Sequence, residues 1–116
     1  MAERERLICD SAALAERGCG VRFEVERNGR PQSAFVVRFD GRAHAFLNQC
    51  GHVPVELDWQ AGEFFDDSRL YLICATHGAL YHPASGACVG GRCAGRGLVT
   101  LPVVERDGHV YLMETQ

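Results

Sequence analysis

Short stretches in which apolar and polar residues alternate recur along the chain. The clearest covers residues 21–26, Val-Arg-Phe-Glu-Val-Glu, and alternation with a period of two predicts a half-buried β-strand. Two dipeptides that favour tight hairpin turns, Asn28-Gly29 and Asp40-Gly41, stand on either side of an apolar run at residues 33–39. Similar patterns predict further strands over residues 7–9, 43–47, 70–73, 98–104 and 109–112, with a third turn at Asp107-Gly108 before the last strand.

Many short strands separated by turns indicate an all-β sandwich or barrel. One short helical turn is expected over residues 12–17, and the glycine-rich stretch at residues 89–97 is expected to be a loop. The chain has 116 residues, with no internal repeat and no linker-like segment. We therefore expect a single domain over residues 1–116.

The charge balance argues against a nucleic-acid-binding protein. Twelve basic and 15 acidic residues give a formal net charge of −3, whereas a nucleic-acid-binding face needs clustered basic residues. No apolar run approaches the roughly 20 residues of a membrane span. The first six residues, Met-Ala-Glu-Arg-Glu-Arg, contain neither an apolar signal region nor a twin-arginine pair, so we expect a cytoplasmic protein.

Candidate chemistry is concentrated in two short motifs, Cys50-Gly-His52 and Cys74-Ala-Thr-His77. The chain has six cysteines, which in an intracellular protein indicate metal ligands or thiols before disulfides. Two thiolates and two imidazoles can bind one zinc ion, or a Rieske [2Fe–2S] cluster with two Cys on one iron and two His on the other. Zinc sites usually pair like ligands, whereas each loop here offers one Cys and one His, which favours the cluster.

The motifs and their flanks resemble the Rieske family over roughly residues 35–112. Gly78 follows the second His, Tyr81 supplies an aromatic residue shortly after it, and a glycine turn comes at Ser85-Gly86. Leu57, five residues after the first His, also matches a family position. The resemblance implies an antiparallel β sandwich with a small cluster-binding subdomain at about residues 48–81. One departure is that the gap between the two ligand pairs is a few residues longer than in common Rieske ferredoxins. We place the extra residues within 59–67.

By this resemblance the ligands of a [2Fe–2S] cluster are Cys50 and Cys74 on the inner iron and His52 and His77 on the outer iron. Neutral imidazoles in place of thiolates raise the reduction potential relative to plant-type clusters. The glycine-rich loop that follows is implied to cover the cluster.

Flanking residues imply a low-potential, ferredoxin-like cluster. High-potential members of the family join their ligand loops by a disulfide, but Val55 and Thr76 occupy the matching positions here. Ala79 stands where those members have a hydroxyl-bearing Ser. Tyr81, however, stands where they have a Tyr that hydrogen-bonds a ligand sulfur, and we expect it to raise the potential somewhat.

The remaining cysteines are given no role as ligands of this centre. Cys9 is expected to be a buried small apolar residue, and Cys19 an incidental thiol. Cys88 and Cys93 could form a disulfide, bind another metal or simply pack. We favour reduced thiols within the covering loop, because cytoplasmic disulfides are rare.

The sequence therefore predicts a small soluble Rieske ferredoxin that is an electron carrier and not an enzyme. By resemblance, its partners are redox proteins, and it passes single electrons from a flavoprotein reductase to an oxygenase or another redox enzyme. One alternative is a structural zinc-binding interaction module using the same four residues. Another is a Rieske subunit with a sensing role in a larger complex. Oligomeric state is not predicted.

Overall fold

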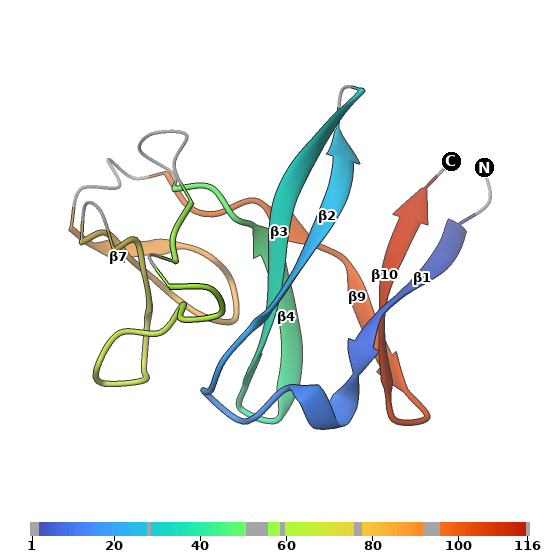
Figure 1. The fold of residues 1–116 in the computed structure, drawn as a ribbon. Coiled ribbons are helices and arrows are strands. Elements are labelled where there is room, and N and C mark those ends of the chain that lie inside the picture. Colours follow the sequence, from blue (N-terminus) through green and yellow to red (C-terminus); the bar gives the residue numbers. More distant parts are fainter. Residues whose placement is uncertain are drawn as a thin grey trace.

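The alternating segments form a fold of antiparallel β-strands (Figure 1). The computed structural model describes residues 3–27, 29–50, 56–58, 60–75, 78–91 and 96–115. Within these ranges the elements are β1 (Glu3–Asp10), the 3-10 turn η1 (Ser11–Ala13), β2 (Val21–Arg27), β3 (Arg30–Phe39), β4 (Arg42–Leu47), β5 (Leu72–Ile73), β6 (Leu80–Tyr81), β7 (Cys88–Gly90), β8 (Thr100–Leu101), β9 (Val103–Arg106) and β10 (His109–Thr115). The predicted all-β antiparallel architecture is confirmed.

The described strands belong to three sheets. One has the order β1-β10-β9, the second has the order β2-β3-β4-β8, and the third and smallest has the order β5-β6-β7. Figure 1 shows the four-stranded sheet between the other two, with the small sheet and its loops on one side. The small sheet carries the second predicted ligand motif, so the candidate site lies at one end of the sandwich.

Strand β3 is buried on both faces because it is an inner strand of the middle sheet. Residues 34–37 are all buried. Phe35 and Val37 face the core beside the small sheet, whereas Val36 packs with Val110 of β10 in the core between the two larger sheets. Burial on both faces explains why this stretch of the sequence is continuously apolar instead of alternating.

Two hairpins follow the turn chemistry read from the sequence. Asp40 and Gly41 have φ values of 53° and 77°, and Asp107 and Gly108 have values of 52° and 79°. Two successive positive φ angles are characteristic of the type I′ turn, whose twist matches that of the flanking strands. The remaining predicted turn begins at Asn28, which lies outside the described residues.

The single strand predicted over residues 98–104 divides at Pro102. Before it, β8 pairs with β4 in the four-stranded sheet, and after it, β9 pairs with β10 in the neighbouring sheet. Proline has no N–H for a sheet ladder, so its position permits the strand to leave one sheet and enter the next. The prediction of one continuous strand was wrong for this reason.

Two further predictions differ from the structure. The helical turn expected over residues 12–17 is limited to Ser11–Ala13, because the chain at Glu16 forms a β-bridge with Arg38 of β3. The loop expected over residues 89–97 begins with a strand, Cys88–Gly90, which pairs with β6. In both places a non-local backbone pairing overrides the local preference. No helix among the described residues is long and apolar enough to cross a membrane.

Candidate metal centre

Two of the four predicted ligands, Cys50 and Cys74, lie in one apolar core beside the small sheet. Cys50 comes shortly after the end of β4 and is 3% exposed, and Cys74 directly follows β5 and is 0% exposed. Neither sulfur is in a disulfide. The other two predicted ligands, His52 and His77, lie outside the described residues. Folding therefore buries both predicted sulfur donors in the same core.

The second ligand loop is closed by backbone hydrogen bonds at its base. Ile73 of β5 pairs with Leu80 of β6. Beyond this pair, the N–H of Cys74 donates to the carbonyl of Ala79 at 2.9 Å, and the N–H of Gly78 donates to the carbonyl of Cys74 at 2.7 Å. These bonds hold Cys74 at the base of a tight loop, so its sulfur has a defined position.

Tyr81 connects the small sheet to the first ligand motif. Its hydroxyl oxygen lies 3.3 Å from Sγ of Cys50, and the tyrosine is 0% exposed. A metal-bound cysteine is a thiolate without a proton, so in that state the tyrosine hydroxyl is the donor. The expected contact of Tyr81 is therefore present with the sulfur of Cys50, one of the two predicted sulfur ligands. Ala79, also 0% exposed, has no side-chain hydrogen-bonding group.

The chemistry of the two cysteines fits a metal centre. A buried thiolate in apolar surroundings is costly unless a positive charge compensates it, and a metal supplies that charge. The described residues contain no group of three or more His, Cys, Asp or Glu side chains arranged to bind a metal ion. The two predicted sulfur donors lie in one core, and the two predicted imidazole donors lie outside the described residues.

Sequence reasoning missed a polar network at the base of the first ligand loop, which we call the loop-base network. It consists of Arg22, Ser33, Asn48, Leu57 and Asp58. Asn48 is a buried polar residue, 4% exposed, two positions before Cys50. In the sequence, the position of Asn48 beside the first motif was the only indication of a role near the site. The partners of its side chain can be seen only in the folded structure.

The longer gap between the ligand pairs contributes to the core. Phe64 is 0% exposed and Phe65 is 7% exposed. The ring of Phe64 stacks on Phe35 of β3 with 3.9 Å between centroids and 11° between planes. Trp59 lies outside the described residues. The two phenylalanines are therefore structural, and they attach the gap segment to the four-stranded sheet.

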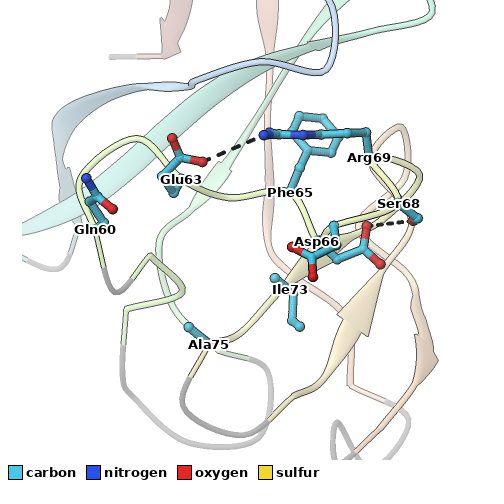
Figure 2. A pocket seen from close by; sticks show the side chains of 9 residues that line it. Gln60, Glu63, Phe65, Asp66, Ser68, Arg69, Ile73 and Ala75 are labelled. Atoms are coloured by element: carbon cyan, nitrogen blue, oxygen red, sulfur yellow. Dashed lines mark hydrogen bonds and ion pairs between the residues drawn. The ribbon is translucent and has the colours of Figure 1, made fainter.

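The same segment borders an open cleft of about 700 Å³ (Figure 2). Glu63 and Arg69 form an ion pair at 4.0 Å across it, and the hydroxyl of Ser68 donates to Asp66 at 2.7 Å. Ala75 also lines it, so the cleft adjoins the second ligand loop. Three carboxylates and one guanidinium give the lining a net negative charge. The residues that line it are Gln60, Glu63, Phe65, Asp66, Asp67, Ser68, Arg69, Ile73 and Ala75.

The start of the glycine-rich segment lies against the second ligand loop. A Cβ added to Gly91 would come within 2.6 Å of the carbonyl oxygen of Gly78, so no larger residue fits there without movement. In the small sheet, Cys88 of β7 lies opposite Tyr81 of β6. The sulfur of Cys88 is in a disulfide. The prediction of a reduced thiol at Cys88 was wrong, because it relied on the expected compartment and not on the sheet that positions the residue. Cys93 lies outside the described residues.

Two other cysteines have environments that disfavour reactivity. Cys9 was expected to be buried but is only partly buried, packed against the core between the two larger sheets, and this burial raises the pKa of its thiol. Cys19 is exposed, and the carboxylate of Glu63, 3.3 Å from its sulfur, raises the pKa of that thiol. At neutral pH both remain mainly protonated, and a protonated thiol is a poor nucleophile and a poor metal ligand.

The family model described as Rieske [2Fe-2S] domain matches residues 5–105 of the chain. A search of curated proteins finds no sequence relative.

Solved structures share the fold. The ferredoxin of carbazole 1,9a-dioxygenase from Nocardioides aromaticivorans IC177 is 20% identical, with a TM-score of 0.73 over 96% of this chain and 98% of that one. A ferredoxin from Sphingomonas yanoikuyae B1 is 23% identical, with a TM-score of 0.72 over 97% and 100%. The terminal oxygenase of carbazole 1,9a-dioxygenase from Novosphingobium sp. KA1 is 26% identical, with a TM-score of 0.69 over 98% of this chain but 30% of that one.

Proposed function

The chain belongs to the Rieske [2Fe–2S] domain family, and from this premise we propose that it is an electron carrier of the ferredoxin type. It passes single electrons from a flavoprotein reductase to an oxygenase or another redox enzyme, and it is not itself an enzyme. The structural comparisons support this role, since they cover nearly all of two ferredoxins but only 30% of a terminal oxygenase.

Four residues hold the cluster in this proposal. Cys50 and Cys74 bind the inner iron, and His52 and His77 bind the outer iron. A [2Fe–2S] cluster supplies the ability to accept and release one electron. The burial of both cysteines supports their assignment to the inner iron, because that iron is the one away from solvent.

The observation that carries the proposal is the 3.3 Å contact between Tyr81 and the sulfur of Cys50. A hydrogen bond to a ligand sulfur stabilises negative charge there, which favours the reduced state of a redox centre.

We further propose that residues 1–116 form one Rieske domain, with its cluster-binding subdomain at about residues 48–81, and that the protein is cytoplasmic. The family model, which matches residues 5–105, supports the single domain. Disulfides are rare in the cytoplasm, so the disulfide at Cys88 is the observation that argues against the cytoplasmic location.

The deciding experiment combines metal analysis, visible absorption and low-temperature EPR of the purified protein. We expect about two iron atoms and two acid-labile sulfides per chain, and a rhombic EPR signal of low average g after reduction by dithionite. A colourless protein with one zinc per chain and no iron after anaerobic reconstitution would overturn the electron-carrier role. It would leave the zinc-binding interaction module as the function.

A further inference from the structure

The loop-base network joins the two ends of the first ligand loop. Asn48 lies directly after β4, at the beginning of the loop, and its side-chain carbonyl accepts a hydrogen bond from the N–H of Leu57 at 2.8 Å. Its side-chain NH₂ donates to Oδ1 of Asp58 at 3.0 Å. One amide therefore binds two consecutive residues at the far end of the loop, and it uses both its acceptor and its donor to do so.

Asp58 is the second fixed point of this network. Its side chain is 0% exposed, and its Oδ2 accepts a hydrogen bond from the N–H of Gly62 at 3.1 Å. Nε of Arg22, from β2, lies 3.7 Å from the same oxygen. A buried carboxylate is stable only when it is hydrogen-bonded and its charge is compensated, and these neighbours supply both.

The network also reaches the second ligand loop. The carbonyl of Leu57 accepts a hydrogen bond from the N–H of Ala75 at 3.0 Å. A continuous series of bonds therefore runs from Asn48 through Leu57 to Ala75. Its ends lie two residues before Cys50 and one residue after Cys74, so it fixes the backbone beside each of the two cysteines.

We propose that Asn48 and Asp58 are positioning residues for the metal centre, holding the two ligand loops at the separation that the cluster requires. This inference rests on the proposed function for the identity of the centre. The complementary donor and acceptor pattern of the two side chains is the feature that carries it, because a residue that merely filled space would not need that pattern.

The pattern allows a swap experiment. In Asn48→Asp, two carboxylates face each other in a buried site, and the donor to Asp58 is lost. In Asp58→Asn, one of the two neighbouring donors, from Asn48 or Gly62, must face the new NH₂ group. In the double variant Asn48→Asp/Asp58→Asn the donor and acceptor exchange places, so the bond between positions 48 and 58 and the acceptor for Leu57 are both restored. The negative charge stays in the network but moves from position 58 to position 48, so the 3.7 Å contact with Arg22 is not restored.

The measurement is the rate at which the holoprotein loses its visible absorption in the presence of an iron chelator, well below the unfolding temperature. We expect each single variant to lose the cluster about tenfold faster or more, which is the effect of leaving buried polar groups unsatisfied. We expect the double variant to return to within about threefold of the wild type, and to regain the wild-type EPR line shape that the single variants broaden.

Glu105→Gln is the matched control. It breaks the partly buried ion pair between Glu105 and Arg38, which lies away from both ligand loops. It should lower the unfolding temperature while leaving the rate of cluster loss unchanged, which separates positioning of the centre from general stability.

Cluster loss by both single variants at the wild-type rate would overturn the proposal. A double variant that loses its cluster as fast as the single variants would also overturn it. If the single variants yield no holoprotein, recovery of holoprotein by the double variant supports the proposal and its failure overturns it. A wild-type protein that binds zinc refutes the electron-carrier function alone, since the same variants can then be compared by their rates of zinc release.

Discussion

The hydroxyl of Tyr81 lies 3.3 Å from the sulfur of Cys50, although the two residues are 31 positions apart in the chain and both are buried. The β5–β6 pairing places the tyrosine, and the end of β4 leads to the cysteine. The contact thus depends on the small sheet packing against the four-stranded sheet. It joins the two ligand motifs through a group that is not itself a ligand.

Replacement of Tyr81 by Phe should lower the reduction potential, because the reduced cluster loses a hydrogen bond to a ligand sulfur. The expected shift is on the order of tens of millivolts, which corresponds to a fraction of the strength of one hydrogen bond. Protein-film voltammetry measures it directly. Tyr111→Phe, on β10 of the distant three-stranded sheet, is the control and should leave the potential unchanged. An unaltered potential in the Tyr81 variant would show that the contact does not tune the centre.

Cys50→Ser and Cys74→Ser should each abolish stable cluster binding, because the hard hydroxyl is a poor replacement for a thiolate at an iron–sulfur centre. Iron content should fall from about two atoms per chain to nearly none. Cys19→Ser is the matched control, because Cys19 is an exposed thiol outside the site. If the Cys19 variant lost its iron while the Cys50 variant retained it, the ligand assignment would be wrong.

Stability should fall in acid through the pair formed by Glu105 and Arg38. The two side chains approach to 2.6 Å, and the hydrogen bond from Arg38 lowers the pKa of Glu105. A carboxyl whose pKa is lower in the folded state than in the unfolded state stabilises the fold above its unfolded pKa. This contribution is lost as the pH falls through the folded pKa.

The Glu105→Gln variant should therefore lose about 1–2 kcal/mol of unfolding free energy at pH 7. The difference from the wild type should shrink towards zero as the pH falls through the lowered pKa of Glu105 in the folded state, where the wild-type carboxyl also becomes protonated. Chemical denaturation of the holoprotein at a series of pH values tests this. A difference that stayed constant down to acidic pH would mean that the ion pair contributes nothing through its charge.

The bonded state of Cys88 predicts a definite thiol count. Protein that is denatured and stripped of iron without a reductant should react with alkylating agent at Cys9, Cys19, Cys50 and Cys74, whereas Cys88 should stay unmodified. After reduction, all six cysteines should react. Mass spectrometry of the alkylated chain counts them. Six reactive thiols before reduction would show that the reduced state expected from the sequence is the one present in solution.

Local chemistry made much of this protein predictable. The Asp40-Gly41 and Asp107-Gly108 turns follow from residues that tolerate positive φ, and the alternation at residues 21–26 follows from a strand with one buried face. The predicted ligand motifs could be recognised for the same reason, since a metal centre demands particular side chains at short spacings. These are properties of neighbouring residues, and they do not depend on the rest of the fold.

Tertiary structure decided what depends on residues far apart in the chain. Only the packing of three sheets shows that the strand at Pro102 changes sheets, that Cys88 is disulfide-bonded beside the core and that Asn48 shares its amide between Leu57 and Asp58. A side chain such as Asn48 has many potential partners in the unfolded chain. Burial selects among them, because each polar group removed from water must find a partner within the folded protein.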